Sequence, residues 1–430
     1  MCRQFMQRAF VLLAFLLSTQ PAMSSNQGAC EDAELFDVAV VGAGLSGLVI
    51  AQALSASRGK LAGLKWVLLE ASSSRVGGRL QNAPGVAGGL DMGGAWVWPA
   101  AGGQWRVASL LDSLSIETFK VRARRAHILS NVCPVCPVAN PSIETLQQPD
   151  EGPRGGSMRI RGGAAAMTNA LASALPAGSI RMGFEVSSCS LVPGSGGKGS
   201  FVQLTAAAAA KKEETASGCA AAGADDRPVR ASTVVFAVPP ALLSTQVAFT
   251  PALSPARQSA MRASKTWMAG VTKVAITFPP PKLDGGAGTA TGTGRFWDST
   301  DAAPSTTNTG LRPGPGRPAF QVYDGSSDFD GKEFAAITFF ALATGVKSDA
   351  ELAALCARQL AEVWSSEARR GEGDKVEART SRLLEAAGEP SSVHIQRWPE
   401  EEFISGPHEK VLPLLSSSSF FSSSSMFALN

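Results

Sequence analysis

Residues 36–70 read FDVAVVGAGLSGLVIAQALSASRGKLAGLKWVLLE, and this stretch decides the fold. It begins with an apolar run long enough for one buried strand, followed by a G-x-G-x-x-G turn at Gly42, Gly44 and Gly47. Apolar residues then recur at helical spacing, and a second apolar run ends on an acid, Glu70. The order of strand, glycine turn, helix, strand and acid predicts a Rossmann-type unit that binds a dinucleotide.

The chemistry of dinucleotide binding gives each position of this motif a separate task. Gly42 allows the tight turn, Gly44 lets a pyrophosphate approach the backbone, and Gly47 lets the helix pack close to the strand. The helix N-terminus offers free N–H groups and the positive end of its dipole to the phosphates. Glu70 can accept hydrogen bonds from ribose hydroxyls. A glycine-rich turn without a nucleotide is the alternative, and the surrounding strands, helix and acid favour the nucleotide.

Composition and charge exclude several classes of function. The chain has 430 residues, of which 44% are hydrophobic, so it can hold two domains or one large one. A net charge of +3, without a basic stripe interleaved with aromatic residues, indicates no nucleic-acid partner. His127, His394 and His408 share no metal-ligand spacing, so no metal site is predicted. Cys133 and Cys136 form a lone C-x-x-C, which favours a local disulfide or two loop thiols over a metal or redox site.

The N-terminus is typical of a targeting segment. Arg3 and Arg8 precede an apolar run at residues 9–17, and no acid occurs before Glu31. The run is too short to span a bilayer, which predicts a cleaved signal peptide and a secretory or extracellular protein with no membrane span after its removal. A signal anchor and an organellar transit peptide are the alternatives.

Three later stretches carry a family resemblance. Residues 70–79, EASSSRVGGR, resemble E-A-x-x-x-x-G-G-R, the second glycine motif of flavoproteins with two dinucleotide-binding domains. Residues 90–99, LDMGGAWVWP, and residues 116–121, IETFKV, resemble the flavin-facing segment of flavin-containing amine oxidases. The chain is identified by these stretches as a member of the flavin monoamine oxidase family, with polyamine oxidases as near relatives. The resemblance runs from about Asp37 to about Gly406.

The resemblance implies that the cofactor is FAD. It implies pyrophosphate contacts from the first glycine motif, ribose contacts from Glu70 and Ala71, a phosphate partner in Arg79, and an adenine contact from Val186. The full implied set is Gly42, Gly44, Leu45, Ser46, Gly47, Glu70, Ala71, Gly77, Gly78, Arg79, Gly93, Gly94, Ala95, Trp96 and Val186. Ser72 departs from the basic residue that the family often has there. Residues 405–408 hold no cysteine where monoamine oxidases bond covalently to FAD, so non-covalent FAD is expected.

Residues 269–278, AGVTKVAITF, predict a strand with one lysine inside it, Lys273. An outward-facing lysine on an edge strand is the plain interpretation. The resemblance implies a catalytic role instead, because amine oxidases hold a lysine here that binds a water beside flavin N5. The lysine also favours amine chemistry over the carotenoid desaturases and protoporphyrinogen oxidases, which share the FAD motif.

The predicted fold is α/β, with a discontinuous FAD-binding domain of Rossmann type interrupted by a mixed-sheet substrate domain. The predicted boundaries are 1–25 for the signal peptide, 36–110 and 158–245 for the FAD domain, 111–157 and 246–405 for the substrate domain, and 406–430 for a serine-rich segment outside the family. Among the elements expected are strands at 180–186, 231–240 and 393–398, a helix at 349–364 and a charged loop at 367–377.

The implied reaction is oxidation of an amine C–N bond to an imine, with a small-molecule amine and O2 as partners and H2O2 as a product. The alternatives are another FAD enzyme of the same fold, such as an amino-acid oxidase or a desaturase-like enzyme, and a non-catalytic FAD-binding remnant. After Trp398 the family continues with a glycine-bearing helix near FAD, whereas residues 412–430 are rich in serine and have no helical period. We therefore expect weak FAD binding and little activity from the chain as written.

Overall fold

The structure is a computed structural model that places most of the regular elements expected from the sequence. It describes residues 34–59, 62–97, 104–120, 158–194, 199–207, 227–264, 270–278, 309–311, 313–327, 334–342, 345–368, 373–401 and 403–404. The chain divides into two compact units. The first unit is formed by residues 1–78 and 171–265, and the second by residues 79–170 and 266–430. The predicted α/β fold, with a Rossmann-type unit, is confirmed.

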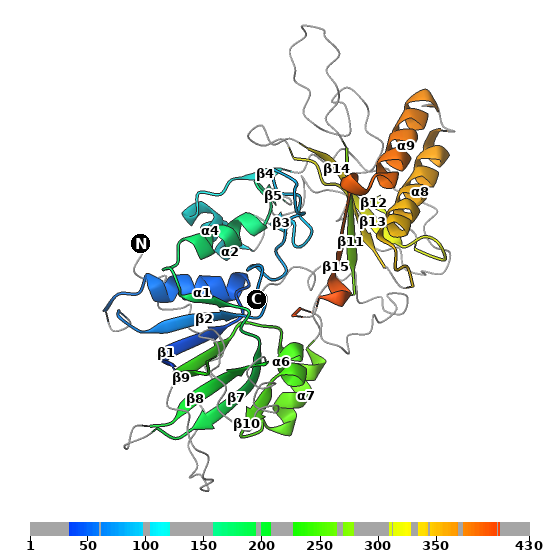
Figure 1. Cartoon of the computed structure of the whole chain (residues 1–430). Helices are drawn as coiled ribbons and strands as arrows, with labels where there is room; N and C mark the ends of the chain where they lie inside the picture. The colour runs from blue at the N-terminus through cyan, green and yellow to red at the C-terminus, as the bar shows by residue number, and fades with distance from the viewer. Residues whose placement is uncertain are drawn as a thin grey trace. The chain divides into compact units, whose positions relative to one another are not determined.

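A seven-stranded sheet is the centre of the first unit (Figure 1). Its strand order is β10-β7-β8-β9-β1-β2-β6. The bounds are β1 Glu34–Val41, β2 Trp66–Glu70, β6 Ile180–Met182, β7 Val186–Val192, β8 Phe201–Ala206, β9 Val229–Phe236 and β10 Ala248–Thr250. β1 pairs in parallel with β2 and β9. The apolar runs at residues 38–41 of β1 and 66–69 of β2 fit a parallel sheet that is covered on both faces.

Three helices accompany this sheet: α1 Leu45–Ser55, α6 Pro240–Gln246 and α7 Pro255–Ala263. Helix α1 packs on β1 and β2 and buries Gly47, Leu48 and Ala51 (Figure 1). α6 begins at Pro240, whose fixed φ suits the first position of a helix, and Pro239 is its N-cap. A fourth helix, α4 Ala165–Ser173, begins in the second unit and ends in the first.

The single strand expected at residues 180–186 is wrong. The segment forms two strands, β6 and β7, which lie at different places in the sheet order. Gly183 separates them with a φ of +73°, a left-handed conformation that glycine adopts without steric cost. Its N–H donates to the carbonyl of Ser72 over 3.0 Å, so the break is tied to the end of β2.

The second unit contains a five-stranded antiparallel sheet and a three-stranded one. The larger sheet has the order β12-β13-β14-β11-β15, and the smaller β3-β5-β4. Their bounds are β3 Trp96–Val97, β4 Thr118–Lys120, β5 Met158–Ile160, β11 Thr272–Phe278, β12 Thr309–Gly310, β13 Ala319–Asp324, β14 Ala335–Ala341 and β15 Val393–Arg397. Helix α2, Trp105–Ser113, precedes β4. Two short 3-10 helices, Pro390–Ser392 and Trp398–Glu400, flank β15.

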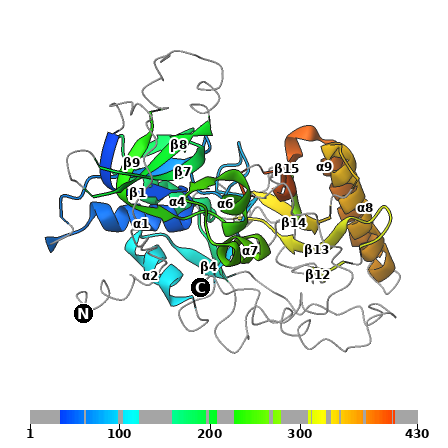
Figure 2. The ribbon, with the colours of Figure 1, turned by 90° about the horizontal axis from the view of Figure 1, so that it is seen from below.

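Two long helices, α8 Asp349–Ala368 and α9 Gly373–Gly388, cover one face of the larger sheet (Figures 1 and 2). Leu352, Cys356 and Trp364 of α8 are buried there with Phe339 of β14. The charged loop expected at residues 367–377 is wrong at both ends, because α8 continues to Ala368 and α9 begins at Gly373. Among the described residues no helix is both long and apolar enough to cross a membrane.

Gln359 connects helix α8 to this sheet through its side chain. Its Oε1 accepts the N–H of Ala319 over 3.0 Å, and its Nε2 donates to the carbonyl of the same residue over 2.8 Å. Ala319 starts β13 beside a register irregularity between Ala319 and Gln321, where one residue of β13 has no regular position opposite β14. The buried amide therefore satisfies backbone groups at the irregular end of the strand.

Candidate cofactor and substrate site

The glycine turn of the first unit has no room for side chains at two of its positions. Gly42 has a φ of +98°, and a Cβ there would lie 2.5 Å from Val238 Cγ1. A Cβ on Gly47 would lie 1.8 Å from the carbonyl oxygen of Gly42. Both glycines are therefore required by the fold itself, as the sequence predicts for a tight turn and a closely packed helix.

Gly44 differs, because a Cβ placed there would meet no atom within 4 Å. It is the N-cap residue of α1, makes no side-chain cap, and is followed by no acid in the first turn. The first N–H groups of the helix thus have no intrahelical partner and begin beside open space at Gly44. A pyrophosphate fits these features, since it would use both the space and the N–H groups. Leu45 is half-buried and Ser46 exposed at the start of the same helix.

The second glycine motif lies against the first. The Gly77 N–H donates to the Ala43 carbonyl over 2.8 Å, and Gly44 and Gly77 form a parallel β-bridge. Gly78 has a φ of +55° and would place a Cβ 3.6 Å from the Cα of Gly44. The Nη1 of Arg75 donates to the carbonyl of Gly78 over 2.7 Å. The structure therefore brings together two motifs that the sequence separates.

Glu70 is held by two backbone N–H groups. Its Oε2 accepts the N–H of Ala43 over 2.7 Å, and its Oε1 accepts the N–H of Ser72 over 2.9 Å. An ionised carboxylate offers about four lone-pair sites, so a ribose hydroxyl can still be accepted. Ala71 is half-buried directly after β2, and Val186 is buried at the start of β7. Glu70 thus has a structural task in the turn in addition to the predicted contact with ribose.

The remaining predicted cofactor residues lie in the second unit. Arg79 is exposed, and its carbonyl accepts the Gly94 N–H over 3.1 Å. A Cβ on Gly93 would lie 1.9 Å from that same carbonyl oxygen, so the turn closes only with glycine there. Ala95 is buried, and the ring of Trp96 lies 4.5 Å from the ring of Tyr323 between centroids.

Lys273 is a charged side chain buried inside a sheet of the second unit. Its strand, β11, pairs on both sides, with β14 and β15, so the interpretation as an edge lysine is wrong. The residue is 1% exposed, and its Nζ donates to the carbonyl of Gly93 over 2.9 Å. Nζ also lies 5.4 Å from the ring centroid of Tyr323 and 5.5 Å from that of Phe340. These contacts stabilise a cation that the strand removes from water.

Burial lowers the pKa of Lys273 to about 7, because the charged form loses its hydration. The carboxylate of Asp91 opposes this shift, and the guanidinium of Arg159 adds to it. Burial also raises the pKa of Tyr323, whose hydroxyl therefore stays protonated. Lys273 is thus a group that can hold or release a proton near neutral pH, enclosed by aromatic rings.

Comparison with known proteins gives the family. A sequence model described as flavin containing amine oxidoreductase matches residues 138–421, more than half of the chain. The chain belongs to this family. A second model, the NAD(P)-binding Rossmann-like domain, matches residues 40–114, which include both glycine motifs of the amine oxidoreductase. Among curated proteins, none matches the chain significantly.

Solved structures of amine oxidases share its fold. Wild-type putrescine oxidase bound to putrescine is 20% identical, with a TM-score of 0.53 and 87% of each chain covered. Cyclohexylamine oxidase from Brevibacterium oxydans is 17% identical, with a TM-score of 0.52, and the match covers 86% of this chain and 87% of that one. At these identities the likeness establishes the fold of this amine oxidoreductase.

Sequence reasoning missed several residues around Lys273. Across the sheet, Lys273 stands opposite Phe340 on β14 and Gln396 on β15, and Phe340 stands opposite Gln321 on β13. Tyr323 lies two residues further along β13, and thus on the same face. Period-two alternation within each strand could have indicated these faces. The pairing register decides which residues of neighbouring strands lie side by side on one face, and it cannot be inferred from the sequence of one strand alone.

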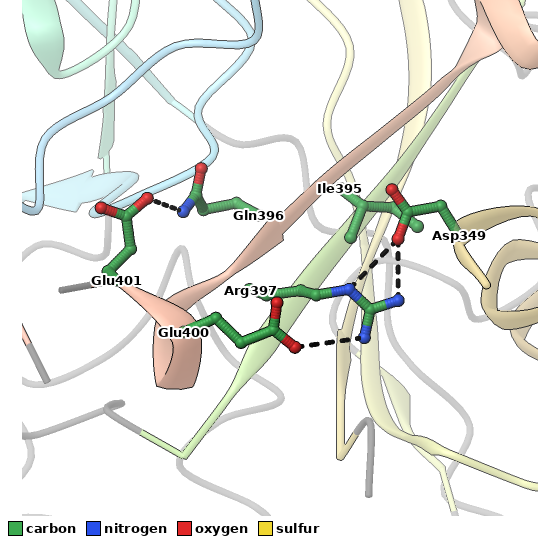
Figure 3. Close-up of a pocket in the computed structure, with 6 residues that line it drawn as sticks. All are labelled: Asp349, Ile395, Gln396, Arg397, Glu400 and Glu401. Atoms are coloured by element: carbon green, nitrogen blue, oxygen red, sulfur yellow. Dashed lines mark hydrogen bonds and ion pairs between the residues drawn. The ribbon is translucent and has the colours of Figure 1, made fainter. Parts of the chain in front are cut away.

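A separate pocket lies at the end of β15 and has a volume of about 210 Å³ (Figure 3). Arg397 donates to Asp349 Oδ1 from Nε over 3.1 Å and from Nη2 over 2.7 Å, and its Nη1 lies 4.0 Å from Glu400. Figure 3 shows Gln396 on the other side of the strand, pointing toward Glu401, to which its Nε2 donates. Asp349 and Glu400 are engaged by Arg397, and Glu401 by the Gln396 amide, so we assign this pocket no role in the reaction.

Several predicted features lie outside the described residues. These are the signal peptide, Trp98, Pro99, Val121, the Cys133–Cys136 pair and residues 405–430. Within the described residues, no group of three or more His, Cys, Asp or Glu side chains could hold a metal ion.

Proposed function

We propose that this amine oxidoreductase binds FAD without a covalent bond and oxidises the C–N bond of a small amine to an imine. In the proposed reaction the amine loses two electrons and two protons, which O2 takes up as H2O2, and water hydrolyses the imine. The observation that carries the proposal is the buried lysine, Lys273, hydrogen-bonded to the glycine turn at Gly93 and enclosed by Tyr323 and Phe340. Family membership supports the same reaction class.

The first unit supplies binding in this proposal. The open space at Gly44 and the N-terminus of α1 would hold the pyrophosphate, and Glu70 would accept from the ribose. Gly77 and Gly78 complete the backbone surface beside Gly44. When bound, FAD supplies the capacity to take a hydride equivalent, which no amino-acid side chain has.

The second unit supplies orientation and proton control. Trp96, Tyr323 and Phe340 present ring faces that would exclude water and favour the apolar part of an amine. Lys273, with a pKa of about 7, would hold a water or a proton beside the reacting centre. Gly93, Gly94, Ala95 and Trp96 would line the flavin side of this group, as the family resemblance implies.

Anaerobic reduction tests the proposal directly. The purified full chain is mixed under anaerobic conditions with a panel of primary amines, diamines and amino acids, and its flavin absorbance is followed. We expect at least one amine to bleach the yellow colour, and admission of O2 to restore it with one peroxide formed per flavin. Bleaching by amino acids alone would support an amino-acid oxidase. A protein that stays yellow with every compound would support a binding role, and one that purifies without flavin would match the weak FAD binding expected from residues 412–430. Either result would contradict the proposal.

A further inference from the structure

A buried ion pair, Asp91 and Arg159, lies in the second unit and has no task in the proposed cofactor contacts. Asp91 is 1% exposed and Arg159 2% exposed, and their Oδ2 and Nη2 atoms lie 3.4 Å apart. Asp91 Oδ1 accepts the N–H of Ala164 over 2.6 Å. Arg159 Nη1 donates to the carbonyl of Ser326 over 2.8 Å. The pair thus joins three segments that are distant in the sequence.

Stability alone is a weak reason for such a pair. A buried ion pair often contributes less than apolar side chains of the same volume, because desolvation offsets the attraction. Here the separation of 3.4 Å is long for a charge-assisted hydrogen bond. The Nε of Arg159 is also buried and has no hydrogen-bond partner among the described residues. These features indicate that the charges serve something besides cohesion.

The pair is connected to Lys273 in two ways. Asp91 precedes by two residues the carbonyl of Gly93 that accepts from Lys273 Nζ. Asp91 also fixes the start of that turn through its bond to Ala164, and Trp398 Nε1 fixes its middle by donating to the Met92 carbonyl over 3.0 Å. The position that Nζ occupies therefore depends on the anchoring of residues 91–93.

The second connection is electrostatic. The charged groups that act on Lys273 are the carboxylate of Asp91, which favours its protonated form, and the guanidinium of Arg159, which disfavours it. The remaining neighbours are neutral near pH 7: Tyr323 on β13 keeps its proton, Phe340 on β14 is apolar, and Gln396 on β15 is an amide. The charge on Lys273 thus reflects a balance between two opposite charges.

We propose that Asp91 and Arg159 are positioning residues for Lys273, which hold both the turn that receives Nζ and the charge that Nζ carries. Removal of the carboxylate leaves Nζ beside an uncompensated cation and favours the neutral amine. Removal of the guanidinium leaves the carboxylate to favour the ammonium. The importance of this charge for catalysis rests on the proposed function, whereas the control of the charge itself does not.

Nuclear magnetic resonance of the lysine side chain tests the proposal without turnover. The full chain is labelled with carbon-13 at lysine Cε, and the Lys273 signal is identified by its absence in Lys273→Met. We expect a titration midpoint near pH 7 in the parent protein. Asp91→Asn should lower the midpoint by about one unit or more, and Arg159→Met should raise it by about one unit.

Arg161→Met is the matched control. Its guanidinium lies 5.6 Å from the ring centroid of Phe119, as that of Arg159 lies 5.5 Å from the same ring. Arg161, however, pairs with the exposed Glu117 and does not act on the charge of Lys273. Its replacement should leave the midpoint unchanged. A shift of the same size in this variant would show that any nearby substitution moves the signal, and would overturn the proposal.

An unchanged midpoint in Asp91→Asn and Arg159→Met, or a Lys273 signal that does not titrate in the parent, would also overturn the proposal. Asp91→Asn can fail to fold because it leaves a buried cation unpaired. Arg159→Met is milder, because the Asp91 carboxylate that remains still has the Lys273 ammonium and the N–H of Ala164 as partners. If Asp91→Asn does not fold, the midpoint measured in Arg159→Met tests the proposal by itself. Amine turnover does not enter the measurement, so its outcome is independent of the test of the proposed function.

Discussion

Gly44 and Gly77 pair in a parallel β-bridge, so the two glycine motifs of the chain form one backbone surface. The hydrogen bond from the Gly77 N–H to the Ala43 carbonyl, 2.8 Å long, closes this contact. The open space at Gly44 is consequently bordered by the start of α1 and by the second motif. A change at either motif therefore alters the same backbone surface, which we propose as the cradle of the cofactor pyrophosphate.

Replacement of Gly44 by valine should abolish FAD binding while leaving the fold intact. A side chain at this position meets no protein atom within 4 Å, so it would fill only the space that the pyrophosphate needs. Flavin content per protein after gel filtration measures the effect. Gly199→Val is the control, because Gly199 lies in the same unit, also has open space around it, and is remote from the cradle in sequence. Equal flavin in Gly44→Val and its parent would show that the turn is structural only.

Glu70→Gln should destabilise the first unit even before FAD is considered. The amide retains one acceptor oxygen but turns an NH2 group toward a backbone N–H, so one of the bonds to Ala43 and Ser72 is lost. The expected loss in the free energy of unfolding is about 1–3 kcal/mol. Urea unfolding with and without added FAD separates this loss from weaker cofactor binding. Glu185→Gln is the control, since Glu185 is a half-buried glutamate of the same unit. Unaltered stability with weaker FAD binding would assign Glu70 to the ribose alone.

Lys273→Met should slow reoxidation of the reduced flavin by O2 more than it slows reduction by the amine. The methionine keeps the volume of the buried chain but can neither hold a water nor exchange a proton. A decrease of about a hundredfold is expected in the oxygen step, measured by stopped-flow on each half-reaction. Lys65→Met, at a lysine whose side chain is 58% exposed, is the control. Rates equal to those of the parent would remove Lys273 from the reaction.

The stability of the parent relative to Lys273→Met should rise with pH. The pKa of Lys273 is about 7 in the folded chain, whereas its ordinary value, which applies to the unfolded chain, is 10.5. Between pH 7 and pH 10.5 this lysine is therefore protonated in the unfolded chain and mostly neutral in the folded one. Stability rises with pH wherever the unfolded state binds more protons, here by up to about 1.4 kcal/mol per pH unit. Denaturant unfolding of both proteins at several pH values from neutral to alkaline measures this. If the difference in the free energy of unfolding between the two proteins did not change with pH, the pKa of Lys273 would not be lowered in the folded chain.

The local sequence pattern was sufficient to predict the Rossmann-type unit at residues 36–70. The alternation of apolar runs and glycines predicts β1, α1 and β2 nearly to their bounds, because every part of that motif lies within a few dozen residues. The sequence does not mark Gly183 as a break, because a single glycine within a run such as residues 180–186 carries no sign of its φ. Helix α9 was missed because its first turns are highly charged, while the residues that pack on the sheet, Leu383 and Ala387, come near its end.

The surroundings of Lys273 could be predicted only in part. Its place in an apolar strand pointed to a special role, and Gly93 was singled out on separate grounds. The hydrogen bond between them joins residues 180 positions apart. Asp91 and Arg159 carry no motif of their own, and their pairing arises from the approach of β5 to the turn after residue 90. Such contacts depend on tertiary packing, which a single sequence does not display.

The double hydrogen bond from Gln359 to Ala319 also fixes where α8 can stand along its own axis. A helix advances about 1.5 Å per residue, so a slip by one residue would break both bonds in a buried place where water cannot replace them. Apolar side chains such as Leu352 and Trp364 tolerate small slides, because their contacts have no direction. The Gln359 amide therefore restricts an otherwise apolar contact between helix and sheet to a single axial alignment.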